Sequence, residues 1–97
     1  MVKRLVVLPI LPMHAEAFVL AYNEAKPFIL SQTGCLHLEL LRSRDDQFIT
    51  LSHWDSEDHL NAYRSTPFFE KTWKHVKTMF SGKAQAFTTV VVDTQSN

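Results

Sequence analysis

Apolar residues along the chain alternate between strand-like runs and helix-like spacing. Runs rich in β-branched residues and leucine predict four strands, over Leu5–Leu11, Cys35–Arg42, Gln47–Trp54 and Ala84–Val92. Pro9 falls inside the first run, and because proline cannot donate a ladder hydrogen bond it favours an edge position or a bulge. The polar stretch Arg44–Asp46 predicts a hairpin turn between the second and third strands.

Helical segments lie between these strands. Residues Met13–Leu30 carry apolar side chains at helical spacing, with Pro27 expected to kink the helix or end its regular part. The segment Gln32-Thr33-Gly34 is the predicted helix stop. A short helix is predicted from the N-cap Asp55 to about Arg64. A further helix begins at Thr66-Pro67, and its apolar stripe is Phe69, Trp73, Val76 and Phe80.

The predicted order is β-α-β-β-α(α)-β, with the second helix split in two. This order is typical of the ferredoxin-like α+β fold, a four-stranded antiparallel sheet with helices on one face. With 97 residues the chain is expected to form a single domain, residues 1–97.

Both faces of the predicted sheet are apolar. In the first strand Leu5 and Val7 alternate with Val6 and Leu8, although helices cover only one side of such a sheet. A second copy of the chain, packed sheet to sheet, is the simplest cover for the other side. We therefore predict a homodimer through the sheet face.

Composition narrows the classes of partner. Ten basic and ten acidic residues cancel, so the sequence has no electrostatic footprint for nucleic acid or for an anionic membrane. No apolar run approaches the length of a membrane helix, and no signal-peptide pattern opens the chain. A lone cysteine, Cys35, excludes an intrachain disulfide, and we expect a cytoplasmic protein with an inert thiol at that position.

The sequence lacks phosphate-loop, dinucleotide-binding, CxxC and HExxH motifs, and we expect neither a metal nor another cofactor. His37 and His53 lie on adjacent predicted strands. In a functional interpretation one of them is a general base or a metal ligand, and in the alternative interpretation it is a partly buried, hydrogen-bonded histidine. Together with Glu39 they make a weak candidate metal set, because their convergence depends on an unknown register.

Aromatic residues give a better indication of a site. Trp54, Tyr63, Phe69 and Trp73 lie on consecutive predicted elements and are expected to line an apolar pocket between helices and sheet. In that pocket the Tyr63 hydroxyl and the Trp73 indole N–H would orient a ligand; the alternative is that these side chains are ordinary core.

With these residues in view, the chain resembles the antibiotic biosynthesis monooxygenase family of dimeric α/β barrels. The resemblance spans nearly the whole chain and is clearest in three segments, Gly34-Cys35, Ser52-His53-Trp54 with the acidic residues that follow, and Leu60–Ser65 leading to Phe68-Phe69. It implies a homodimer whose pockets each bind a small phenolic or hydroquinone molecule and oxidise it with O₂, without metal or bound flavin.

Two positions depart from the family pattern. Many members carry an acidic residue where this chain has Ser52, and many carry histidine where it has Tyr63. The resemblance therefore leaves His53 or Tyr63 to handle the proton, with Trp54, Tyr63, Phe69, Trp73 and His37 binding the substrate.

Two other functions are considered on the same fold. One is a non-catalytic dimer that binds or senses a small apolar ligand, which the missing polar pair favours. The other is haem degradation, because a haem-degrading branch with this fold is similar to the chain through the second and third helices. Its axial histidine falls on Trp73, and because tryptophan cannot ligate iron this function is disfavoured.

Overall fold

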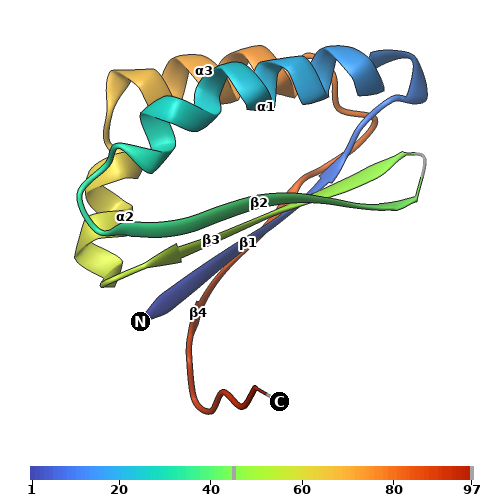
Figure 1. Cartoon of the computed structure of the whole chain (residues 1–97). Helices are drawn as coiled ribbons and strands as arrows, with labels where there is room; N and C mark the ends of the chain where they lie inside the picture. Colours follow the sequence, from blue (N-terminus) through green and yellow to red (C-terminus); the bar gives the residue numbers. More distant parts are fainter. Residues whose placement is uncertain (45, 97) are drawn as a thin grey trace.

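The computed structural model describes residues 1–44 and 46–96, so Asp45 of the predicted hairpin turn and the terminal Asn97 lie outside the described residues. Three α-helices and one short 3-10 helix pack on one antiparallel sheet (Figure 1). The strands are β1 (Val2–Pro9), β2 (Cys35–Arg44), β3 (Gln47–Trp54) and β4 (Gln85–Val90). The helices are η1 (Pro12–His14), α1 (Ala15–Leu30), α2 (Glu57–Arg64) and α3 (Pro67–Lys77).

The strands follow the order β2-β3-β1-β4, and every neighbouring pair is antiparallel. This is the ferredoxin-like α+β fold that the sequence predicts. It corrects the expectation that Pro9 marks an edge strand, because β1 lies in the middle of the sheet. Pro9 is tolerated there because it is the last residue of β1, beyond the final β1–β4 pair of Val7 with Gln85.

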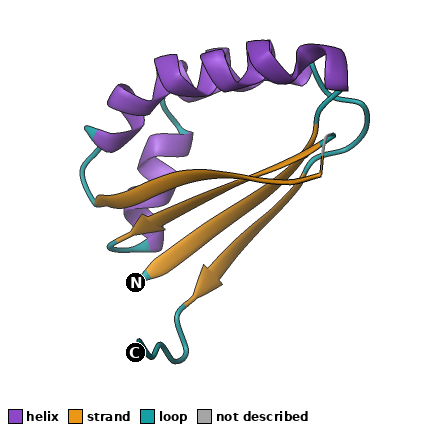
Figure 2. Ribbon diagram, turned by 45° about the vertical axis from the view of Figure 1, so that its right-hand side comes forward, coloured by secondary structure: helices purple, strands orange, loops and turns teal. Residues whose placement is uncertain are grey.

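All three α-helices lie on one side of the sheet, and the other side carries no element of the described chain (Figure 2). Even-numbered residues of β1 face the helices, where Val6 and Leu8 form the core with Phe48 of β3 and Phe18 of α1. Odd-numbered residues such as Leu5 point to the uncovered face. Successive side chains of a strand alternate between faces, so the even-numbered and the odd-numbered apolar residues of β1 lie on two different surfaces of the sheet.

Local signals account for the positions of the short helices. The Ser56 side chain accepts a hydrogen bond from the His59 backbone N–H at the start of α2, so Ser56 and not Asp55 is the N-cap. Thr66 caps α3 in the same way, with Pro67 at the first helical position. The α3 helix ends at Lys77, and Phe80 lies outside it in an isolated bridge.

The remaining boundaries differ from the prediction by a few residues. The β1 strand begins and ends earlier than expected, β2 extends to Arg44, and β4 is shorter than expected at both ends. The α1 helix continues through Pro27 to Leu30. Strand ends are set by backbone pairing, which the hydrophobic pattern does not encode.

Candidate functional site

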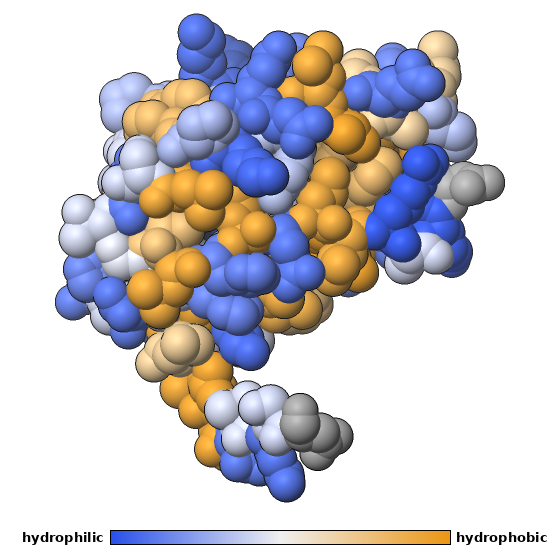
Figure 3. Space-filling model, viewed as in Figure 1, coloured by the Kyte–Doolittle hydropathy of each residue, from blue (hydrophilic) through white to orange (hydrophobic). Residues whose placement is uncertain are grey.

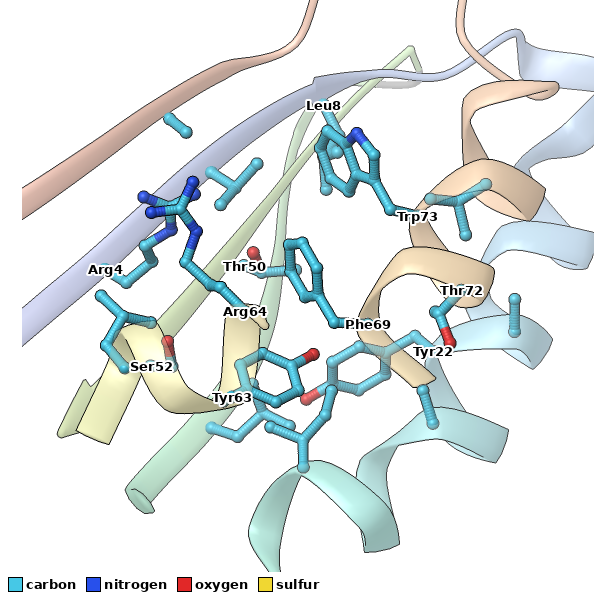
Figure 4. Close-up of a pocket in the computed structure, with 18 of the residues that line it drawn as sticks. Arg4, Leu8, Tyr22, Thr50, Ser52, Tyr63, Arg64, Phe69, Thr72 and Trp73 are labelled. Atoms are coloured by element: carbon cyan, nitrogen blue, oxygen red, sulfur yellow. The ribbon is translucent and has the colours of Figure 1, made fainter. Parts of the chain in front are cut away.

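A cavity of ≈ 340 Å³ lies between the sheet and the three α-helices. Its floor comes from helix-facing residues of all four strands, and its walls come from one face of each α-helix. Figure 4 shows Phe69 and Trp73 of α3 directed into this space, with Tyr22 of α1 and Tyr63 of α2 side by side. The volume falls within the range of about 300 to 1,000 Å³ that is typical of small-molecule sites. We call this cavity the helix–sheet pocket.

Aromatic rings in contact form one wall of the pocket. Trp54 stacks on Tyr63 with ring centroids 5.3 Å apart, and Tyr63 meets the edge of Phe69 at 5.2 Å. Phe69 lies parallel to Trp73 at 6.2 Å. Each ring therefore fixes the orientation of the next, and the wall presents flat apolar surface to a planar ligand. The structure brings together the four aromatic residues that the sequence singles out.

Trp54 forms the deepest part of this wall. Its side chain is 0 % exposed, and its indole Nε1–H donates a hydrogen bond to the Ser52 hydroxyl at 2.9 Å. Both residues face the helices from β3. Because the buried indole N–H is satisfied within the protein, Trp54 supports the pocket by its ring and has no donor left for a ligand.

The Tyr63 hydroxyl is the polar group held by the aromatic wall. Burial raises the pKa of Tyr63 to about 12, with the nearby Cys35 adding to the effect and Arg4 opposing it. The hydroxyl has no hydrogen-bond partner among the described residues. At neutral pH it is therefore a protonated donor, which is suited to binding a substrate oxygen and unsuited to removing a proton. Burial also raises the pKa of Tyr22, with Glu39 contributing.

Two arginines complete the pocket at the end where α2 stops. Arg4 is half-buried on β1, and Arg64 is the exposed last residue of α2. Figure 4 shows their guanidinium groups next to each other. Burial lowers the pKa of Arg4, and the positive charge of Arg64 lowers it further. This pair was not predicted from the sequence, although Arg4 lies on the same face of β1 as the core residues Val6 and Leu8.

The structure corrects the expectation that His37 and His53 reach this pocket. The two residues are cross-strand partners on the uncovered face of the sheet, with ring centroids 4.6 Å apart. His37 Nε2 lies 3.0 Å from a Glu39 carboxylate oxygen, while His53 Nε2 is buried without a partner in the described residues. Burial lowers the pKa of His53, and Lys3 and His37 lower it further. The physical reason is strand alternation, because His53 must point away from the side that Trp54 faces.

The polar lining of the pocket is limited in chemistry. Among the described residues that line it there is no aspartate, glutamate or histidine. The uncharged polar side chains are those of Thr50, Ser52, Thr72, the two tyrosines and the two tryptophans. Across residues 1–44 and 46–96, no group of three or more histidine, cysteine, aspartate or glutamate side chains is arranged to hold a metal ion. Cys35 is half-buried, and burial raises the pKa of its thiol.

A comparison with models of known protein families identifies the family of this chain. The family model described as antibiotic biosynthesis monooxygenase matches residues 1–74, which covers three of the four strands and most of α3. The chain belongs to this family. The match includes Trp54, Tyr63, Phe69 and Trp73, so the aromatic wall lies within the region that the family model covers.

Solved structures of similar proteins share the fold of this monooxygenase-family chain. A candidate antibiotic biosynthesis monooxygenase from Deinococcus radiodurans superposes with a TM-score of 0.90 at 15 % identity, over 100 % of this chain and 98 % of that one. Rv0793 from Mycobacterium tuberculosis gives a TM-score of 0.87 at 16 % identity, over 98 % of each chain. A protein from Caulobacter crescentus with the same family description as the first gives 0.87 at 18 % identity, over 95 % and 90 %.

No curated protein sequence matched the chain. Within the part of the chain that the structure describes, none of the helices has the length and apolar character needed to cross a membrane.

Proposed function

We propose that this protein is a monooxygenase that uses O₂ to oxidise a planar phenol or hydroquinone in the helix–sheet pocket, without a bound cofactor. The observation that carries the proposal is the pocket itself, a largely apolar cavity of ≈ 340 Å³ with a stacked aromatic wall that includes the Tyr63 ring and its hydroxyl. Membership of the monooxygenase family supports the reaction class. An electron-rich hydroquinone supplies the electrons itself, so the protein has to bind it, orient it and exclude water.

The reaction balances without another reductant. A hydroquinone and O₂ give a hydroxyquinone and water, with one oxygen atom entering the ring and the other leaving as water. Tyr63 has the role of a hydrogen-bond donor to the developing oxyanion of the substrate, since its raised pKa keeps its proton on. This replaces the expectation that His53 or Tyr63 removes the proton.

We also propose that a second copy of the chain covers the free face of the sheet. That face carries Leu5, Val7, Ile49 and Leu51 on its two central strands, and Phe87 on β4 is 50 % exposed. Figure 3 shows further apolar residues at the surface of the molecule between more polar regions. Apolar surface of this kind on a small domain favours association.

A second candidate function is ligand binding without turnover. The specific observation in its favour is the absence of a carboxylate or imidazole among the described pocket residues, which leaves no side chain of ordinary basicity to accept a proton. The two candidates differ in one measurable property, consumption of O₂.

Oxygen uptake by chelator-treated protein tests the proposal. We expect turnover with a hydroquinone or anthrone-type phenol, and a fall in kcat of about 100- to 1,000-fold in Tyr63→Phe, which removes one oxyanion donor. The comparison variant His53→Gln changes the other face of the sheet and is expected to keep its turnover. Ligand-induced stabilisation with no O₂ uptake on any substrate would move the conclusion to the binding function.

A further inference from the structure

The arginine pair, Arg4 and Arg64, is the feature of the pocket that its apolar character does not explain. Guanidinium groups stay charged in proteins, so two positive charges lie at one end of a largely apolar cavity. Within the described residues neither forms an ion pair with a carboxylate. Arg4 donates one hydrogen bond, to the Thr88 hydroxyl at 2.9 Å, which leaves most of its donors unused.

Two like charges side by side are unfavourable unless something compensates for them. The lowered pKa of Arg4 reflects this repulsion together with burial. The compensation does not come from the neighbouring strand residues, because the cross-strand partners of Arg4 are Ser52 and Thr88, both uncharged. An anion bound between the guanidinium groups would remove the repulsion and use the free donors.

The approach to this end of the pocket is also basic. A shallow groove beside the pocket shares Arg64, Phe69 and Trp73 with it and adds Lys74 and Lys77. Glu70 is the one acidic residue in its lining. An anionic ligand that approaches along α3 therefore meets an excess of positive charge before it reaches the aromatic wall.

We infer that the ligand of the helix–sheet pocket is a planar aromatic molecule that carries an anionic oxygen group, held between Arg4 and Arg64 with its rings on the Tyr63–Phe69 wall. The inference rests on the proposed function for the ring system and adds the charge. For a phenolic substrate it also favours ionisation, because the positive end of the pocket stabilises the phenolate while the proton passes to water and not to a protein base. The electron-rich anion is the form that reacts with O₂.

The test is a binding measurement that involves no turnover. Naphthoate and its uncharged analogue naphthamide have nearly the same shape, and calorimetric titration gives the affinity of each for the intact protein. Because a hydrogen-bonded ion pair is stronger than a neutral hydrogen bond, we expect naphthoate to bind about tenfold more tightly or better, with the difference shrinking as salt is added.

Variants of the arginine pair locate the preference. In Arg4→Gln and Arg64→Gln we expect naphthoate to lose about tenfold in affinity while naphthamide changes little. Lys71→Gln removes the same charge from an exposed site on α3 and is expected to keep the preference. Arg4→Lys retains the charge in a similar volume, so retention of the preference there separates a charge effect from misfolding. Thermal unfolding of each variant checks that it is folded.

Naphthol distinguishes the two sources of an anionic oxygen. If the site takes a phenolate, the absorption change on ionisation of bound naphthol will occur at lower pH with the wild-type protein than with Arg4→Gln. If it takes a carboxylate on the ring, naphthoate will show the preference and the ionisation of naphthol will not shift.

Equal affinities of naphthoate and naphthamide, no binding of either, or a preference that survives both arginine variants would overturn the inference. None of these results depends on O₂ uptake, so failure of the charge argument is distinguishable from failure of the proposed oxidation.

Discussion

Of the two glycines, Gly34 is the one at which an added methyl group is predicted to destabilise the fold more. Its φ of +86° lies in the region that favours glycine, and a Cβ built there would lie 2.4 Å from Cγ and 2.6 Å from Cβ of His59. The side chain of His59 is itself held, because its Nδ1 lies 2.8 Å from the Ser56 hydroxyl that caps α2. Asp55 N–H also donates to the Gly34 carbonyl at 2.9 Å, so this contact fixes the start of the helix that carries Tyr63.

The magnitude follows from two separate costs in Gly34→Ala. The left-handed backbone costs a residue with a Cβ about 1–2 kcal/mol. Forcing His59 aside costs about 1–3 kcal/mol more, as overpacking usually does. We therefore expect a loss of roughly 2–5 kcal/mol in the free energy of unfolding, measured by urea denaturation. Gly82→Ala is the matched control, because the nearest atom to its added Cβ is 3.9 Å away, and the change is expected to stay within about 0.5 kcal/mol.

A double-mutant cycle separates the two costs. His59→Gly removes the three atoms that would lie nearest to the new methyl group, so the double variant should recover about 1–3 kcal/mol relative to the sum of the single changes. The backbone cost should remain. A Gly34→Ala protein as stable as the Gly82→Ala control, or additive behaviour in the cycle, would refute the reasoning.

Two further predictions concern the uncovered face of the sheet. Burial, Lys3 and His37 lower the pKa of His53, Glu39 opposes them, and β4 presents no titratable group on that face. Neutral His53 therefore stabilises the fold above the unfolded pKa of about 6.5, and this stabilisation is lost as pH falls through the lower folded pKa. Urea titrations at several pH values should show a smaller loss of stability on acidification in His53→Gln than in the wild type, and equal losses would contradict the assignment. Phe87→Lys places a charge on the proposed dimer contact and should weaken self-association in sedimentation experiments by at least about tenfold. Val90→Lys, on the opposite face of β4, should leave self-association unchanged. A monomeric wild-type protein would contradict the proposed dimer.

The proximity of the rings in the aromatic wall could be predicted from sequence because they lie on three consecutive elements of the chain. Trp54 ends β3, Tyr63 is near the end of α2, and Phe69 and Trp73 are about one turn apart on α3. Helical spacing and chain order are visible in a sequence, and they bring these rings together in any fold with this order of elements.

The faces of the strands were harder to predict, although part of the information was present. His53 directly precedes Trp54, so alternation alone places the two on opposite faces, and a pocket that uses Trp54 excludes His53. The contribution of Arg4 depends on the register of β1 against β3 and β4. Long-range pairing fixes that register. The hydrophobic pattern of β1 does not reveal it, because this strand carries apolar residues on both of its faces.

Pro9 shows the same limit on the prediction of topology. Proline within an apolar run is typical of an edge strand, and the sequence contains no sign that β4 stops pairing at Val7. The end of α3 is a similar case. Phe80 continues the apolar spacing of the helix, but its backbone pairs with Ile10 in an isolated bridge instead.

The most direct test of the central claim is the fate of the two atoms of ¹⁸O₂ during turnover of a hydroquinone by the chelator-treated protein. The proposed monooxygenase predicts one labelled atom in the hydroxyquinone product and one in water, with no accumulation of hydrogen peroxide and a reduced rate in Tyr63→Phe. Unlabelled product with stoichiometric peroxide, or no uptake of oxygen by folded protein that binds the same hydroquinone, would contradict it.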